Sequence, residues 1–142
     1  MSLLNRTAAG AVACALTVGV AAASAASTTA LKASLKGSNE TEKGDPNGRG
    51  TATVRIKGTQ LCYTLSLKNV ATTNAGHIHR GKSGVAGAVV VPLYMGTPKT
   101  KGCVTVKASL AKEIAKTPSG FYVNVHNAAY PGGAMRGQLS KG

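Results

Sequence analysis

Three histidines are the residues of this chain whose type and spacing point most directly to chemistry. His77 and His79 are two residues apart, and His126 lies in another strand-like segment. Side chains two positions apart in a strand project from the same side, about 6 to 7 Å apart at the backbone. Such a pair can chelate one metal ion, and imidazole ligands suit copper or zinc. We therefore expect these three histidines to hold one copper or zinc ion if the third lies beside the pair.

The same histidines also have a purely structural interpretation. Imidazoles in a folded domain are satisfied by backbone carbonyls or by polar neighbours, which here are Asn124, Asn127 and Tyr130. In a metal site, the ring nitrogen that does not bind the ion also needs a partner. A backbone carbonyl or the Asn124 side chain is expected to supply it. Spacing alone leaves the metal site and the structural interpretation open.

Other catalytic constellations are missing from the sequence. The chain has four acidic residues, Glu40, Glu42, Asp45 and Glu113, and three of them share one turn-rich segment. This disfavours a calcium or magnesium site and a hydrolase with paired carboxylates. The sequence also lacks a Gly-x-Ser-x-Gly motif and a phosphate-binding loop. We therefore assign no catalytic residue.

The elements that must position the histidines are predicted to be β-strands. Apolar and polar residues alternate with a period of two, as in half-buried strands. The strand-like segments are residues 31–36, 51–57, 61–67, 87–93, 103–107, 121–126 and 134–140. The segment 87–93 is expected to end at Pro92, and a turn at residues 58–59 makes 51–57 and 61–67 a hairpin.

One helix is expected over residues 109–116, with Ser109 as its N-cap and Pro118 beyond its end. Seven or eight short strands separated by turns indicate an all-β protein. We expect an antiparallel β-sandwich with one short helix, either immunoglobulin-like or superoxide-dismutase-like.

The N-terminal segment has the pattern of a secretory signal peptide. One positive charge, Arg6, precedes an apolar run over residues 7–23, and small residues follow. We expect cleavage near Ala26, which leaves residues 27–142 as one domain with no membrane span. The protein is then secreted, to the cell exterior or the periplasm.

The cysteines agree with export. Cys14 lies in the expected signal peptide, which leaves Cys62 and Cys103 as an even pair in an oxidising compartment. Both lie on the outward side of their strand patterns. A disulfide between them closes a loop of about 40 residues and stabilises the fold by about 4 kcal/mol in the chain-entropy model.

The mature chain is strongly basic. It keeps 16 of the 17 Lys and Arg residues and all four acidic residues, which leaves a net charge of +12. This charge favours an anionic cell-surface polymer or another protein as the partner. Alternatively, the charges form only a solvated surface. The chain has one Phe, no Trp and no long basic run, so we expect no specific nucleic-acid binding.

Two motif blocks carry a resemblance to a known family. They are residues 75–81 (AGHIHRG) with 84–93, and residues 120–127 (GFYVNVHN) with 130–139 (YPGGAMRGQL). These blocks resemble the chordin (CHRD) domain over about residues 31–139. The resemblance implies an extracellular β-sandwich, which also occurs alone in short exported bacterial proteins, and it places the strand of His126 beside that of His77 and His79. It implies no established catalytic activity.

A second, weaker resemblance concerns the order of the site residues. A His-x-His pair, a later Val-x-Val-His and a Gly-rich turn before an Arg are similar to the copper ligands and active-site Arg of Cu/Zn superoxide dismutases. The likeness implies that His77, His79 and His126 are ligands and that Arg136 attracts anions. The sequence has no fourth, bridging histidine and no zinc ligands between His79 and His126. Any bound metal is then a single ion.

Three functions remain open at this point. The first is a non-enzymatic secreted binding module of unknown ligand. The second is a copper- or zinc-binding protein, and the third is a redox enzyme of the superoxide dismutase type.

Overall fold

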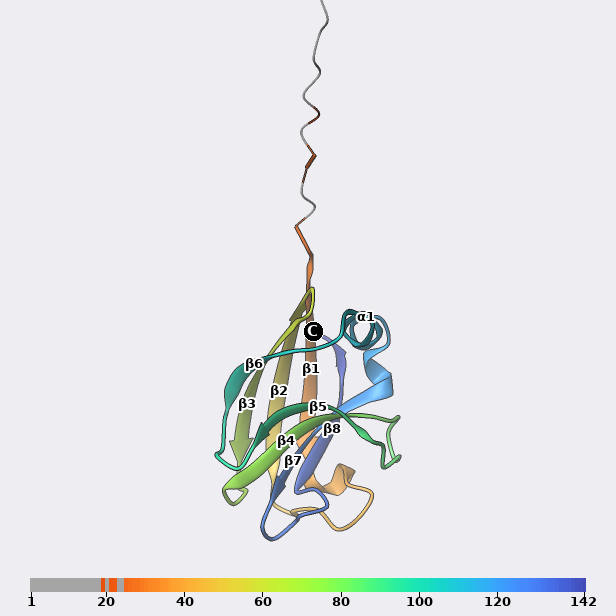
Figure 1. Cartoon of the computed structure of the whole chain (residues 1–142). Helices are drawn as coiled ribbons and strands as arrows, with labels where there is room; N and C mark the ends of the chain where they lie inside the picture. The colour runs from red at the N-terminus through yellow and green to blue at the C-terminus, as the bar shows by residue number, and fades with distance from the viewer. Residues whose placement is uncertain (1–18, 20, 23–24) are drawn as a thin grey trace, which may run out of the picture.

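The structure is a computed structural model that describes residues 19, 21–22 and 25–142 (Figure 1). The expected signal peptide over residues 1–26 lies for the most part outside the described residues. Within the described part, no helix combines the length and the apolar character that crossing a membrane requires.

The described chain is built mainly from strands. In order they are β1 (Thr28–Lys36), η1 (Gly37–Asn39), β2 (Arg49–Lys57), β3 (Gln60–Lys68), β4 (Thr73–Arg80), β5 (Val89–Met95), β6 (Lys101–Thr105), α1 (Ala108–Lys116), η2 (Pro118–Gly120), β7 (Phe121–Asn127), β8 (Met135–Gln138) and β9 (Ser140–Lys141), where η marks a single 3-10 turn. The expectation of an all-β protein with one short helix is confirmed.

All the strands belong to one antiparallel sheet with the order β5-β4-β7-β8-β1-β2-β3-β6, and β9 pairs with β1. In Figure 1, β4, β5 and β7 cross the direction of β1, β2 and β3 at a steep angle. The sheet therefore curls into a nearly closed, sandwich-like barrel, with α1 at one end.

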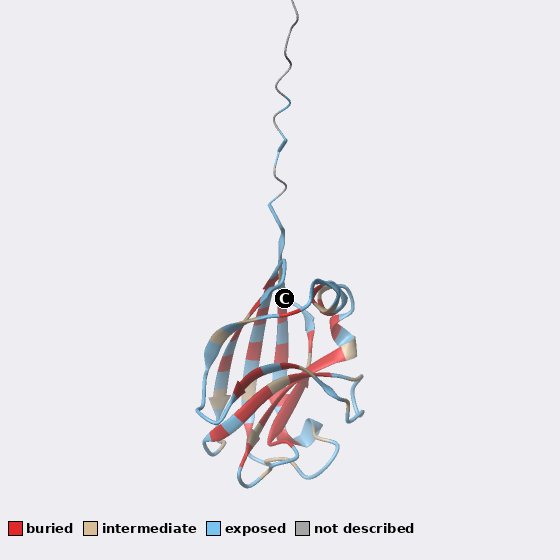
Figure 2. Cartoon of the chain, viewed as in Figure 1, coloured by how far each residue is buried: buried red, intermediate tan, exposed pale blue. Residues whose placement is uncertain are grey.

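The first half of the sheet follows the alternation in the sequence. Leu31, Ala33 and Leu35 of β1 point into the core, and the residues between them are exposed. Strands β2 and β3 repeat this pattern, which gives the banded colouring in Figure 2. Burial of one face and hydration of the other fixes the register of these strands.

Strands β7 and β8 are buried on both faces. In β7, Val123 and Val125 lie in the core, but the outward residues Tyr122 and Asn124 are also buried. Three loops cover this outer face: the β1–β2 loop (37–48), the β4–β5 loop (81–88) and the β7–β8 loop (128–134). Their contacts with the outward side chains, given below, enclose the histidines between strands and loops.

Two details of the predicted elements are wrong. Pro92 does not end its strand, because β5 lies at the end of the strand order and its outer edge needs no hydrogen bond from residue 92. Ser109 is not the N-cap, because the helix begins at Ala108, with Lys107 as a cap residue whose side chain makes no capping bond. The helix starts there since the Lys107 carbonyl already accepts the amide hydrogen of Ala111.

The expected last strand, 134–140, is interrupted. It consists of β8 and β9, separated at Leu139, whose amide binds the Phe121 carbonyl and whose side chain lies in the core. This break raises the number of strands in the described part to nine.

The disulfide is present as expected. Cys62 of β3 and Cys103 of β6 are direct cross-strand partners, with their Cα atoms 4.0 Å apart. Both are on the outward side, opposite the buried Leu61 and Tyr63. The bridge therefore ties the edge strand β6 to the sheet without occupying the core.

Candidate metal centre

The structure brings the three histidines together. His77 and His79 lie on β4 and His126 on the adjacent antiparallel strand β7, where Ala75 is its register partner. All three side chains are on the outer face, since Ile78 between the first two is fully buried in the core. The ring centroids are 5.0 to 6.1 Å apart.

One nitrogen of each ring faces a common point. These three atoms lie within 4.8 Å of one another. Three atoms so placed share a point no farther than about 2.8 Å from each (4.8 Å divided by √3). Metal bonds to imidazole are about 2.0 to 2.1 Å long, so small ring movements bring all three into bonding distance.

Hydrogen bonds to carbonyls fix which nitrogen is available on two of the rings. Nδ1 of His79 lies 2.8 Å from the Gly87 carbonyl oxygen, and Nδ1 of His126 lies 3.0 Å from that of Pro131. A carbonyl oxygen can only accept, so both Nδ1 atoms carry the hydrogen. The Nε2 atoms are therefore left with lone pairs. Nε2 of His79 is buried and has no hydrogen-bond partner among the described residues.

The third ring uses its other nitrogen. Nδ1 of His77 lies 3.2 Å from Nε2 of His126, close to the about 3.3 Å that separates two ligands of a tetrahedral ion with such bonds. Nε2 of His77 lies 3.1 Å from the sulfur of Met95. In the metal-free protein, Nδ1 of His77 can donate to His126. To hold a metal ion, Nδ1 would have to be without a hydrogen, and Nε2 would then carry it and could donate it to the Met95 sulfur.

Burial keeps two of the imidazoles neutral. It lowers the pKa of His77 from 6.5 to about 4, and the nearby His126 and His79 rings add to the shift. Burial also lowers the pKa of His79, which the bond to Gly87 counteracts in part, while His126 and Arg136 lower it further. Neutral imidazole is the form that binds metal, so these two ligands are ready at neutral pH.

Tyr122 supports the His79 ring. The two are register partners on β7 and β4, and their rings stack at 4.9 Å with an angle of 10°. The Gly87 amide donates to the Tyr122 hydroxyl at 3.0 Å, while the Gly87 carbonyl accepts from His79. A Cβ at Gly87 would lie 1.5 Å from the Arg80 carbonyl oxygen. Only glycine therefore fits at position 87, where the backbone amide and carbonyl hold the Tyr122 and His79 rings in place.

Arg136 lies in this layer but is not exposed to incoming anions. Its guanidinium lies 4.3 Å above the Tyr122 ring, and its Nε donates to Glu40 at 2.6 Å. The two ion-paired side chains are 8% and 2% exposed. A further bond runs to the Val85 carbonyl at 3.1 Å. The anion-attracting role that the likeness to superoxide dismutase implied therefore has no exposed cation at Arg136.

Asn124 does not hold an imidazole. Its amide donates to Glu40 at 2.5 Å and to the Met135 carbonyl at 2.9 Å. It is the register partner of His77, but Glu40 of the β1–β2 loop reaches over the strand and binds it instead. The expected support from Asn124 is thus replaced by the carbonyls of the two other covering loops.

Glu40 is the main residue that the sequence did not single out. It connects Arg136 and Asn124 beneath the β1–β2 loop. Burial raises its pKa, and the bonds from these two partners counteract part of the shift. Its position in a turn-rich segment made it look like a solvent-exposed loop residue. Tyr122 carried a readable signal, since it shares the outward side of its strand with His126.

The histidine cluster opens to solvent through a hollow of about 430 Å³. It is lined by Asn74, Ala75, His77, Met95, Gly96, His126 and Pro131. His79 is 9% exposed and forms the inner wall of the cluster, whereas Met95 is 67% exposed at the mouth. A metal ion can therefore enter from the side of His77 and His126.

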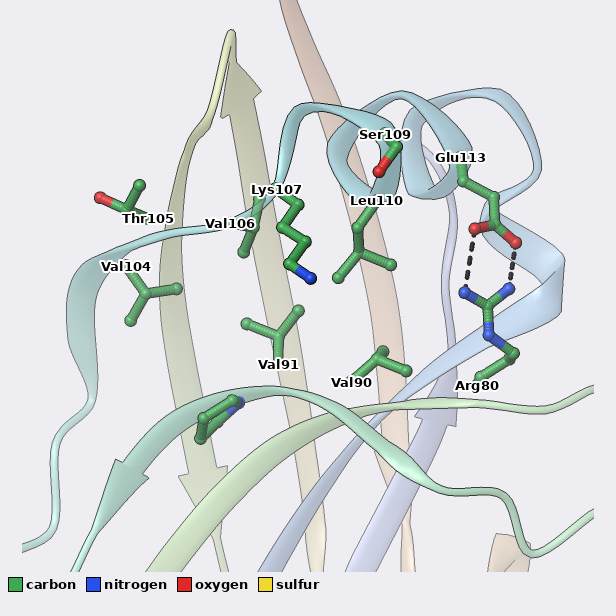
Figure 3. Close-up of a pocket in the computed structure, with 11 residues that line it drawn as sticks. Arg80, Val90, Val91, Val104, Thr105, Val106, Lys107, Ser109, Leu110 and Glu113 are labelled. Atoms are coloured by element: carbon green, nitrogen blue, oxygen red, sulfur yellow. Dashed lines mark hydrogen bonds and ion pairs between the residues drawn. The ribbon is translucent and has the colours of Figure 1, made fainter.

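A larger cavity lies elsewhere, between β5, β6 and α1, with a volume of about 640 Å³ (Figure 3). Four valines and one leucine line it together with polar and charged residues. The carboxylate at its rim, Glu113, is bound by Arg80, with one of the two contacts at 2.9 Å. This cavity contains no imidazole, so it offers no comparable set of metal ligands.

The comparison with family models explains the two motif blocks of the sequence. The CHRD domain model matches residues 31–139, which covers nearly all of the described chain. The chain belongs to the CHRD domain family. No curated protein and no solved structure matches it. The matched residues include β4 and β7, the two strands of this CHRD domain that carry the three histidines.

Proposed function

We propose that this CHRD-domain protein is an exported, non-enzymatic binding module whose ligand is one copper or zinc ion. The observation that carries the proposal is the convergence of three ring nitrogens from two adjacent strands. Each ring is neutral when it binds, and each has a partner for its other nitrogen. Export is supported by the signal-like N-terminal sequence and by the disulfide, which is typical of oxidising compartments.

The residues of the site fit a resident metal ion. The buried Nε2 of His79 has no hydrogen-bond partner among the described residues, and leaving such an atom unpaired costs free energy. A cation at the common point gives this lone pair a partner. Bound copper or zinc can supply Lewis-acid chemistry, and copper can also exchange an electron.

The protein's own groups hold and shield the site. His77, His79 and His126 would hold the ion, the carbonyls of Gly87 and Pro131 fix the hydrogen on Nδ1 of two rings, and the His79 ring is buried. Coordination to three imidazoles with one open side suits storage or transfer of a metal ion.

Metal titration tests the proposal. Protein refolded with its disulfide intact and stripped by chelator should bind one equivalent of Zn²⁺ or Cu²⁺, measured by calorimetry and by elemental analysis. His79→Gln should lower the affinity at least a hundredfold, because it removes the inner ligand. Asn74→Ala, a change at the mouth of the hollow that removes no ligand, should keep wild-type affinity.

Two results would overturn the proposal. One is a stoichiometry near zero in folded wild-type protein. The other is equal affinity in wild type and His79→Gln. Thermal unfolding of each metal-free variant verifies that a loss of binding does not come from a loss of fold.

A further inference from the structure

A second surface, separated from the strands of the histidines by β8, carries a charge pattern that the fold does not need. It is the outer face of β1, β2, β3 and β6, where every second residue is exposed. We define this basic face by its exposed Lys and Arg residues, which are Lys32, Lys36, Arg49, Arg55, Lys57, Lys68 and Lys101. The other exposed positions are mainly Thr and Ser.

No acidic residue lies on the strands of the basic face. Three of the four acidic residues lie in the β1–β2 loop and the fourth is Glu113 of α1. In the described part of the chain, the ion pairs are Arg80–Glu113 and Arg136–Glu40, and neither is on this face. The positive charges of the face are therefore not compensated within the protein.

The strand register places three of these charges in one row. Lys36 of β1 is the direct partner of Arg49 of β2, and Arg49 is the direct partner of Lys68 of β3. Neighbouring strands are about 4.8 Å apart, so the three side chains leave the sheet close together. Like charges directly opposite one another destabilise a sheet. A row of this kind is expected where an anion compensates it.

The same row borders a hollow of about 350 Å³. Its lining includes Arg49 and Lys68 together with the hydroxyls of Thr51 and Ser66. One guanidinium nitrogen of Arg49 binds the carbonyls of the β1–β2 loop, and this holds the arginine at the edge of the hollow. The two cations can only donate hydrogen bonds, and the two hydroxyls can donate or accept them. This set suits the oxygens of a phosphate or sulfate group, which act as acceptors.

The charges continue beyond this row. A second row crosses the sheet two residues beyond Thr51, on the side away from Arg49. There Thr53 of β2 and Thr64 of β3 are partners, and they are flanked by Lys32 of β1 and Lys101 of β6. Cations thus recur across the whole face rather than around a single point. A ligand with repeated charges matches this better than a single small anion.

We propose that the basic face binds an anionic cell-surface polymer that carries phosphate or sulfate groups along its chain, with one such group in the hollow between Arg49 and Lys68. The proposal is independent of the metal centre, which lies on the outer face of β4 and β7. The polymer passes over exposed Thr, Ser and Lys side chains and needs no change in the sheet.

The test compares two variants with the same net charge. The first carries Lys36→Gln, Arg49→Gln and Lys68→Gln, and it removes the row. The control removes three exposed lysines from outside the face: Lys82, Lys112 and Lys116, each changed to Gln. The probes are linear polyphosphate and dextran sulfate, with uncharged dextran and polyglutamate for comparison, and binding is measured by calorimetry at several salt concentrations.

We expect the row variant to lose at least tenfold in affinity for polyphosphate or dextran sulfate, and the control less than threefold. The dependence of log affinity on log salt should become less steep by about two to three in the row variant, since each removed contact reduces it by about one. If only one of the two polymers shows this loss, the group in the hollow is assigned to phosphate or to sulfate. Arginine or lysine exchanges at the three positions should keep binding.

Thermal unfolding gives a second readout. Because the row is self-repulsive, a double variant with Lys36→Gln and Lys68→Gln, which keeps the Arg49 bonds to the loop carbonyls, should unfold at the same or a higher temperature than wild type. Equal losses of affinity in the row variant and the control would show that net charge alone attracts the polymer. That result, tighter binding to polyglutamate than to both oxyanion polymers, or a lower unfolding temperature of the double variant would overturn the proposal.

Discussion

Acid should destabilise the metal-free protein through His77. Its pKa is about 4 in the folded protein and about 6.5 in an unfolded chain, because burial and neighbouring rings disfavour the charged form. Above pH 6.5 the ring is neutral in both states and contributes nothing. Between pH 6.5 and 4 the unfolded chain takes up a proton that the folded protein does not. The free energy of unfolding therefore decreases as the pH falls through this range.

The size of the effect follows from the two pKa values. The gap between 6.5 and about 4 corresponds to about 3 kcal/mol, because each pH unit is worth about 1.4 kcal/mol per proton. Most of this loss should be complete near pH 4. Below that value His77 is protonated in both states, and its contribution no longer changes.

Urea denaturation of chelator-treated protein at pH 7, 6, 5 and 4 measures the effect, with His77→Gln as the matched variant. The lowered pKa of His79 and the raised pKa of Glu40 act in both proteins. The difference between the two proteins therefore isolates His77, and it should shift by about 3 kcal/mol in favour of the variant between pH 7 and 4. A difference that stays constant with pH would show that the folded site protonates as readily as the unfolded chain.

Three further predictions concern the supports of the fold and the site. Replacing Cys62 and Cys103 by Ser should lower the free energy of unfolding by about 4 kcal/mol, from the loop that the bridge closes; equal urea midpoints of the reduced and oxidised wild type would contradict this. Tyr122→Leu removes the stacked ring and its hydroxyl, and should weaken zinc binding about tenfold at unchanged stoichiometry in a chelator competition assay; unchanged affinity would mean that the ring orients nothing. Glu40→Gln leaves the Arg136 charge buried without its partner and should cost about 3 to 5 kcal/mol in urea denaturation; a cost below 1 kcal/mol would show that water reaches the pair.

The strands and the core of this protein are readable from its sequence because they depend on a local pattern. Leu31, Ala33 and Leu35 alternate with polar residues, and one buried face decides which side each residue takes. The same period placed Cys62 on the outer side of its strand and put the first two histidines on one face. The family resemblance supplied the neighbouring strand of the third, which period alone does not provide.

The surroundings of the site were not predictable in this way. They depend on where three irregular loops fold back, and no period describes that. Glu40 is polar and lies in a turn-rich segment, yet the loop buries it against Arg136. From the sequence, the Asn124 amide could donate to an imidazole nitrogen or to another acceptor. In the structure it donates to the Glu40 carboxylate. Backbone carbonyls such as that of Gly87 are identical at every residue, so the sequence gives no sign of which one a ring will meet.

The burial of β7 on both faces separates two kinds of substitution along a single strand. Inward positions such as Val123 and Val125 touch the apolar core, and a change there alters the free energy of the whole barrel. Outward positions such as Tyr122 and His126 touch loops, whose length and composition can vary without disturbing the strand pairing. New binding chemistry can therefore arise on the outer side of β4 and β7 by successive single substitutions, each made while the inner side keeps the chain folded.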